Sequence, residues 1–271
     1  MTTMTMATVS TMAVGRRTPA LVLVAHGTRS PAGIAVTEAL AARVRALRPE
    51  YDVRVGYLGL VAPSLDEVLA GLRGEAVLVP LLLGTGHHVR VDIPAAVASA
   101  GPRLRCRTAP ALGPHPLLAE ALADRLAEAG REARSPAPVV LAAAGSSDPA
   151  ARADTARMAR LLALGMGVRV VPSYVSGAGP RPAEAVAELR EEGHEGVSVA
   201  TYLTAPGHFS ESVRNSVRRG VSDVLVSRPL GPHDAVARLV VRRYQQAGAG
   251  GCGHPGTSRT PVTSVGRIRT A

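Results

Sequence analysis

The side chains best suited to chemistry in this chain are histidines that follow apolar runs. His26 ends LVLVAH, and His87 and His88 lie side by side in LLLGTGHHVRVDIP. Neutral imidazole binds transition metals through a ring nitrogen and can also accept a proton. Structural zinc usually takes four ligands, often with cysteine, so two or three histidines leave the shell incomplete. The sequence predicts an open site that holds a metal ion briefly or removes a proton.

Apolar runs alternating with helical patterns determine where these histidines lie. Polar and apolar residues do not alternate within these runs. Continuous apolar runs are typical of strands that are buried on both faces of a parallel sheet. We expect strands at 20–25, 52–58, 76–83 and 103–109, and helices at 31–48, 63–73, 92–101 and 115–130. Asp92 is the expected N-cap of the third helix. Because ligands bind beyond the carboxyl ends of parallel strands, the histidines are predicted to gather at that edge.

The same pattern repeats after a proline-rich segment at 135–138. LVLVAHGTRSPA aligns with VVLAAAGSSDPA, YLGLVAPSL with YVSGAGPRP, and LLLGTGHH with YLTAPGHF, in the same order. We therefore predict an α/β protein of two homologous lobes, each a mostly parallel sheet flanked by helices. The expected organisation is a disordered segment at 1–18, lobes at 19–134 and 137–245, and a disordered tail at 246–271. His208 lies at the equivalent strand end of the second lobe, whereas Ala144 replaces His26 there.

Composition restricts the partners. The net charge is +10, and all 31 basic residues are arginine, which favours an anionic partner such as nucleic acid, phosphate or a carboxylate-rich small molecule. Arginine suits carboxylates, and a chain with no Trp and one Phe lacks the aromatic rings on which single-stranded nucleic acid stacks. Two cysteines, Cys106 and Cys252, are too few for an iron–sulfur site. No apolar stretch reaches the roughly 20 residues of a membrane span, and the N-terminus lacks the order of a secretory signal, so we expect a cytoplasmic protein.

The phrases LVLVAHGTRSPAG, YLGLVAPSL and GHHVRVDIPAA resemble the class II tetrapyrrole chelatases, specifically the sirohydrochlorin cobaltochelatases and ferrochelatases. The resemblance runs from residue 20 to about 245 and matches the duplicated long form. It implies that Fe²⁺ or Co²⁺ is inserted into sirohydrochlorin in a cleft between the halves, for siroheme or cobalamin biosynthesis. It also implies His26 and His88 as catalytic residues and metal ligands, with the metal as substrate and no permanently bound cofactor. Arg29, Arg90 and His208 are the expected contacts to the substrate.

One departure from the family pattern is at Gly59. Relatives often carry an acidic residue there, and the second half offers Ser176 at the matching position. The missing carboxylate is replaced by His87, Asp92 or Glu211, or the two main histidines suffice; the sequence leaves these alternatives open.

Two other functions stay open at this point. One is a tetrapyrrole or metal carrier that binds without insertion, which the departure at Gly59 favours. The other is a histidine phosphatase, although its nucleophile normally follows an arginine, whereas Ala25 precedes His26. We expect no specific nucleic acid and no membrane as partners, and a monomer or weak oligomer.

Overall fold

The computed structural model describes residues 18–28, 30–59, 61–220 and 223–249. The elements of the first half are β1 (Ala20–Ala25), α1 (Pro31–Leu47), β2 (Val53–Tyr57), α2 (Leu65–Ala70), β3 (Gly74–Pro80), a π-helical turn η1 (His88–Asp92), α3 (Ile93–Ser99), β4 (Leu104–Thr108) and α4 (Pro116–Glu128). Those of the second half are β5 (Val139–Ala143), α5 (Pro149–Met166), β6 (Val170–Tyr174), α6 (Pro182–Glu191), β7 (Ser198–Tyr202), α7 (His208–Gly220), β8 (Leu225–Val226) and α8 (Asp234–Ala249). Of the segments predicted to be disordered, 1–18 and 246–271, residues 1–17 and 250–271 lie outside the described residues. Residues 246–249, predicted to belong to the tail, are helical.

Each half forms a four-stranded parallel sheet with the same topology. The strand orders are β2-β1-β3-β4 and β6-β5-β7-β8, and every pairing is parallel. All residues of the central strands β1 and β5 are buried, because helices cover both faces of each sheet. This burial explains the continuous apolar runs of the sequence. The predicted α/β fold with two parallel sheets flanked by helices is confirmed.

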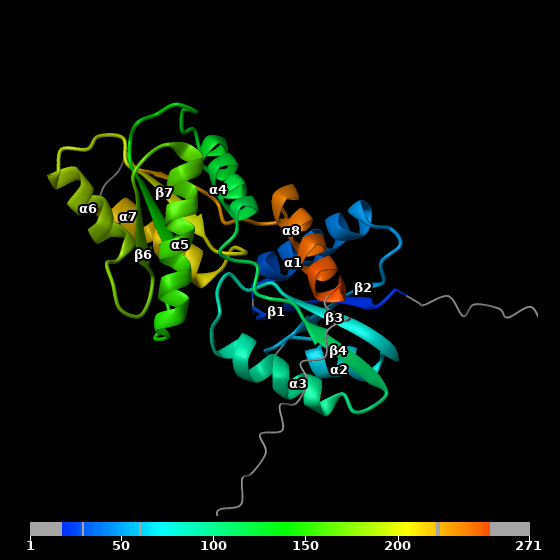
Figure 1. Cartoon of the computed structure of the whole chain (residues 1–271). Coiled ribbons are helices and arrows are strands. Elements are labelled where there is room, and N and C mark those ends of the chain that lie inside the picture. Colours follow the sequence, from blue (N-terminus) through cyan, green and yellow to red (C-terminus); the bar gives the residue numbers. More distant parts are fainter. Residues whose placement is uncertain (1–17, 29, 60, 221–222, 250–271) are drawn as a thin grey trace, which may run out of the picture.

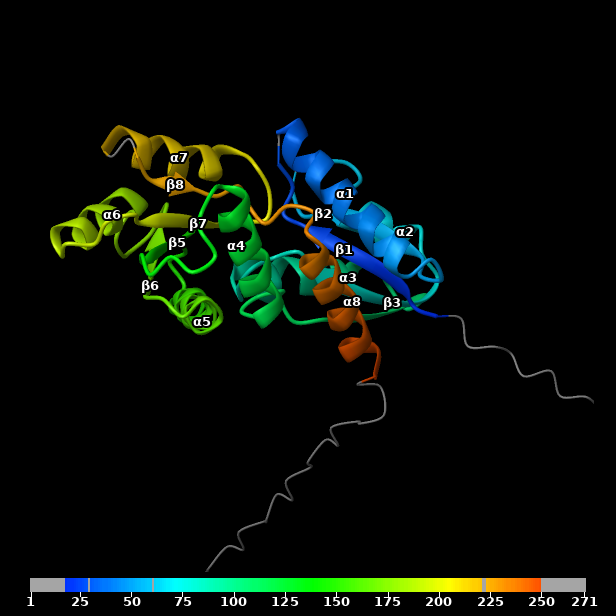
Figure 2. The ribbon, with the colours of Figure 1, turned by 90° about the horizontal axis from the view of Figure 1, so that it is seen from above.

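The last helix of each half packs on the other half. α4 lies against α5 and β7 of the second sheet, whereas α8 lies against α1, β3 and β4 of the first (Figure 1). The view from above shows the same exchange, with the two helices side by side near the middle of the molecule (Figure 2). The division of the sequence at 134–137 therefore does not coincide with a division in space.

The exchange joins the two halves in one core. The largest cluster of buried side chains includes Leu23 from β1, Leu122 from α4, Leu141 from β5 and Leu239 from α8, all fully buried. Two smaller clusters fill the outer faces, one beneath α2 and α3 and the other beneath α6 and α7. Because each fully buried leucine stabilises by about 1.5–3 kcal/mol, the shared cluster holds the halves together.

Both exchanged helices begin at the same corner, Leu-Gly-Pro-His, at 112–115 and 230–233. The Nδ1 atom of His115 accepts a hydrogen bond from the Leu117 N–H at 3.1 Å, and that of His233 accepts one from Ala235 at 3.1 Å. Such caps satisfy N–H groups that the first helical turn leaves unpaired. These corners are a fourth pair of matching segments, beside the three aligned above. The shared tetrapeptide is the sequence signal for them.

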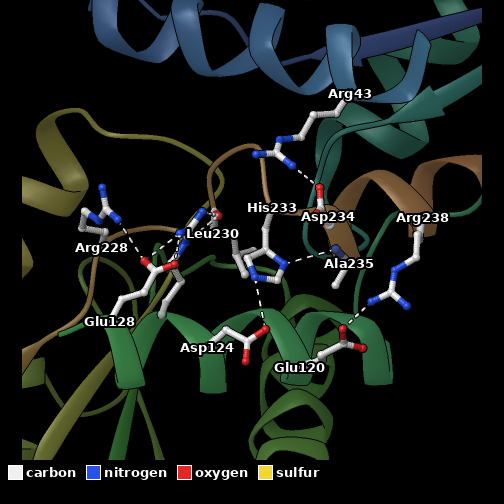
Figure 3. A network of polar contacts seen from close by, with 11 residues as sticks. Arg43, Glu120, Asp124, Glu128, Arg228, Leu230, His233, Asp234, Ala235 and Arg238 are labelled. Atoms are coloured by element: carbon white, nitrogen blue, oxygen red, sulfur yellow. Dashed lines mark hydrogen bonds and ion pairs between the residues drawn. The ribbon is translucent and has the colours of Figure 1, made fainter. Parts of the chain in front are cut away.

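Polar contacts connect α4 with the segment that leads into α8 (Figure 3). Asp124 lies 3.2 Å from His233, Glu128 pairs with Arg228 at 2.9 Å, and Glu120 pairs with Arg238. The exposed pairs of Glu128 and Glu120 with arginine contribute about 0–1 kcal/mol each, so they orient the crossing more than they stabilise it. None of the helices within the described ranges is long and apolar enough to cross a membrane.

Candidate functional site

A cavity of about 720 Å³ opens where the carboxyl ends of β1, β3, β5 and β7 face each other between the halves. His26, Gly86 and His88 line it from the first half, and Ala144, His208 and Phe209 from the second. A volume of 300–1,000 Å³ is typical of small-molecule sites. The mouth of the parallel sheets is thus where a ligand fits, as the sequence predicts.

His26 follows the last residue of β1 at the wall of this cavity. The next residue, Gly27, has a φ of +88°, and a Cβ atom added there would lie 3.5 Å from the backbone nitrogen of Gly59. Glycine therefore permits the sharp turn that leaves the imidazole at the strand end. Burial and the neighbouring His88 lower the pKa of His26, and Asp92 acts in the opposite direction. The imidazole is consequently neutral over most of the physiological pH range.

His88 meets His26 from the end of the loop after β3. Their ring centroids are 4.5 Å apart, with the rings tilted by 49°. The Nδ1 atom of His88 is hydrogen-bonded to a carboxylate oxygen of Asp92, four residues later on the same face of the helical turn. A carboxylate partner of this kind fixes the ring and leaves Nε2 as the nitrogen available to a ligand.

The prediction that Asp92 caps a helix is wrong. The helical turn begins four residues earlier, at His88, and the Ile93 N–H donates to the carbonyl oxygen of His88. The side chain of Asp92 makes no cap hydrogen bond and contacts His88 instead. His87 lies farther out, with a side chain 73 % exposed and its Nε2 atom 4.0 Å from Asp92. Of the three candidates for the missing acid, Asp92 is therefore the one in contact with the histidine pair.

The second half presents different side chains at the matching positions. Ala144 stands in place of His26, and in the register of the repeat Phe209 stands in place of His88. Phe209 is 42 % exposed, and its ring centroid lies 5.9 Å from that of His208 at the start of α7. Within the described residues, no group of three or more His, Cys, Asp or Glu side chains comes together as a metal site. The imidazole pair thus belongs to one half alone.

Comparison with known proteins agrees with this geometry. The family model CbiX matches the chain twice, at residues 20–129 and 138–247. The chain belongs to the CbiX family. Two matches in tandem also confirm the resemblance to the long form of the sirohydrochlorin chelatases.

Relatives of this CbiX-family chain include named chelatases and a structure with a bound metal. A sirohydrochlorin ferrochelatase of Priestia megaterium is 24 % identical over 82 % of this chain and 87 % of its own length. One of Bacillus subtilis is 28 % identical over 72 % of this chain and 78 % of its own length. The structure of SirB from Bacillus subtilis with Fe³⁺ superimposes with a TM-score of 0.75, at 26 % identity, covering 85 % of this chain and 96 % of SirB.

One of the two predicted substrate-binding arginines, Arg90, lies within the described residues. Arg90, on the turn that carries His88, forms an ion pair with Asp148 of the second half. Asp148 is also the N-cap of α5, because it accepts a hydrogen bond from the Ala150 N–H at 2.9 Å. Arg29 lies outside the described residues. In this CbiX-family chain the charge of Arg90 is therefore balanced by a carboxylate of the other half.

The partner of Arg90 cannot be recognised in the sequence. Ser-Asp-Pro at 147–149 is a recognisable helix start, so Asp148 could be predicted as a cap. Its contact with a side chain of the other half depends on how the two sheets face each other, which no local signal reveals. Glu211, on the first turn of α7, is not among the residues that line the cavity.

Proposed function

We propose that the protein is a chelatase that inserts Fe²⁺ or Co²⁺ into sirohydrochlorin. The observation that carries this proposal is the pair His26 and His88, with ring centroids 4.5 Å apart on the wall of the cavity. Two imidazoles with no third protein ligand among the described residues bind a divalent ion incompletely. Such a site leaves coordination positions for the macrocycle nitrogens that must take the metal over.

The reaction replaces two pyrrole protons with one divalent cation. His88 holds the incoming metal through Nε2, and Asp92 on its Nδ1 orients the ring and balances the charge. The lowered pKa of His26 keeps one of its ring nitrogens unprotonated, so that nitrogen binds the ion and then accepts a pyrrole proton as the metal leaves. Water takes the second proton at the open mouth of the cavity. Metal binding and proton transfer both require His26 and His88 to lie next to each other.

Substrate contacts are proposed on the opposite wall. Phe209 supplies an aromatic face suited to a planar macrocycle, and the neighbouring His208 supplies a donor for a carboxylate. Arg29 is retained as a proposed carboxylate contact from its position after β1 in the sequence. Arg90 reaches a substrate carboxylate only by releasing Asp148, so we assign it a weaker part in binding.

Relatives named for both metals match this chain. Relatives of this chain include the Bacillus subtilis ferrochelatase, 28 % identical, and a sirohydrochlorin cobaltochelatase of Methanopyrus kandleri, 37 % identical over 28 % of this chain. Imidazole accepts both ions, and selectivity follows from geometry and supply rather than from affinity alone.

The test is an insertion assay with purified protein, sirohydrochlorin and either Fe²⁺ or Co²⁺, followed by absorbance. We expect the spectrum of the metallated macrocycle to develop well above the spontaneous rate with at least one metal. A rate equal to the spontaneous rate with both would favour the carrier alternative, and tight binding of sirohydrochlorin would then identify the carrier. Membership of the CbiX family leaves the histidine phosphatase alternative without support.

A further inference from the structure

The loop that carries the histidine pair is fixed to the opposite half of the molecule. Residues 81–87 connect β3 with the turn that starts at His88, and they include two glycines, Gly84 and Gly86. Glycine-rich backbone is costly to order, so such a loop needs contacts to hold one conformation. The contacts described here come from α5 and β7 of the second half.

Asp154 makes the main contact, from the second turn of α5. Its Oδ2 atom accepts a hydrogen bond from the Thr85 N–H at 3.0 Å and another from the Thr85 hydroxyl at 2.6 Å. The residue is only 3 % exposed, and its second oxygen pairs with Arg157. Hydrogen bonds to a buried carboxylate are among the stronger kinds. Burial by itself raises the pKa of Asp154, but the Thr85 and Arg157 contacts outweigh it and leave the pKa below its ordinary range.

A second contact from the same half holds the loop two residues earlier. The hydroxyl of Tyr202, at the end of β7, donates to the Leu83 carbonyl oxygen at 3.0 Å. Residues 83 and 85 are thus both tied to the second half, just before the histidines begin. The intervening Gly84 lies close enough to α5 that a Cβ atom added there would be 3.5 Å from the Asp154 carboxylate.

The contact has no counterpart in the other half. In the register of the repeat, Thr85 corresponds to Pro206 and Asp154 corresponds to Val36. Proline has no N–H to donate, and valine has no acceptor. A general requirement of the fold would be met on both sides. Instead, the pair occurs only beneath the loop that bears the imidazole, and Phe209 takes the place of His88 on the side that lacks it.

We propose that Asp154 is a positioning residue of the metal site: through Thr85 it holds the loop so that His88 meets His26. The proposal rests on the role proposed above for the histidine pair. It makes α5 of the second half part of a metal site whose two imidazoles, His26 and His88, come from the first half.

The test measures Co²⁺ binding by calorimetric titration, counting only the part that is lost in His88→Ala, together with kcat and KM for insertion. Asp154→Ala is expected to weaken that binding and lower kcat by about 10–100-fold, as losses of partners behind metal ligands do. The KM for sirohydrochlorin is expected to change less than kcat, because the second-half wall with His208 and Phe209 keeps its contacts. Thr85→Val is expected to show a smaller loss, and Thr85→Ser, which keeps the hydroxyl, is expected to restore wild-type values.

Two further variants separate positioning from general destabilisation. Asp124→Ala removes another carboxylate contact between the halves, to His233, and is expected to leave Co²⁺ binding unchanged. The double variant Thr85→Val/Asp154→Ala is expected to lose no more than Asp154→Ala alone, since both changes remove one interaction.

The proposal is overturned if folded Asp154→Ala and Thr85→Val bind Co²⁺ within about twofold of wild type, the usual error of such comparisons. It is also overturned if Asp124→Ala loses as much as Asp154→Ala. Failure of the wild-type protein to insert any metal would refute the proposed function instead, and the Co²⁺ titrations would still decide the role of Asp154.

Discussion

At the end of β1 the first half carries His26, whereas the second half carries Ala144 at the end of β5. The strands around these two positions have the same order, the same direction and the same register. The loops after β3 and β7 show a similar difference: the first half has a histidine, His88, where the second half has Phe209. Both ends face one cavity.

This difference shows how a duplicated fold can divide its work. The backbone of each half creates an equivalent strand end, and in the site proposed above one imidazole pair serves one metal ion. The second half places Phe209 on the cavity wall and supplies the carboxylates that contact the first half's loop and turn. Because α4 and α8 are exchanged, neither half can move away without uncovering the shared core.

The largest effect is expected when a histidine of the first half is replaced by the residue at the matching position of the second half. His26→Ala introduces the residue found at the matching position, and we expect insertion to fall by about 10³-fold, within the range for loss of a group that transfers protons. His88→Ala is expected to act similarly. The rate is measured by absorbance with sirohydrochlorin and Co²⁺. His194→Ala, in the loop before β7 at the opposite end of the sheet, serves as the control. Near-native activity of either main variant would refute the site.

The structural equivalence of the halves is tested in the exchanged helices. Leu122→Ala in α4 and Leu239→Ala in α8 both remove fully buried side chains from the shared core. Each is expected to lower the free energy of unfolding by about 2–5 kcal/mol. Urea unfolding followed by circular dichroism should show one transition in both variants. Two separate transitions would mean that the halves unfold independently, contrary to the exchange.

The histidines that cap α4 and α8, His115 and His233, are expected to have a smaller effect on the free energy of unfolding. His115→Ala and His233→Ala each remove an N-cap acceptor and are expected to cost about 0.5–2 kcal/mol. Burial and the nearby Arg243 and Arg242 lower the pKa of His115, so the unfolded chain binds a proton more readily than the folded one. The stabilisation is therefore complete above pH 6.5, the ordinary value, and is lost as the pH falls below it.

Urea unfolding at several pH values checks the effect at His115. His115→Ala should flatten the acid side of the stability profile relative to wild type. The lowered pKa of His26 adds a slope of the same sign, which remains in both proteins. An unchanged slope in His115→Ala would contradict the assignment.

The smallest expected effect comes from adding charge to the first half. Gly59→Glu introduces a carboxylate next to His26. An opposite charge near the metal is worth about 1 kcal/mol in a water-exposed setting, or about fivefold in Co²⁺ affinity. A Cβ atom at Gly59 would lie 3.1 Å from the His26 carbonyl oxygen, so Gly59→Ala is the matched control for that crowding. A titration with Co²⁺ compares the two variants. Equal affinities would show that Asp92 already supplies the charge.

Much of the fold was predictable because its signals are local. Apolar runs such as 20–25 and 76–83 fill buried parallel strands, and the repeated phrases reveal two equivalent halves. From the strand ends it followed that His26 and His88 would share one edge. Their separation, the cavity and the contact with Asp92 did not follow, since Asp92 was expected to cap a helix that in fact begins earlier.

The sequence by itself determined which residues could bind a metal and at which strand ends they stand, because strand burial and glycine turns depend on neighbouring residues. Only the tertiary structure decided what holds them. The exchange of α4 and α8, the ion pair of Arg90 with Asp148 and the hydrogen bonds of Thr85 with Asp154 join residues far apart in the chain. Such contacts depend on which surfaces of two sheets meet, and that is set by packing of the whole core rather than by any local pattern.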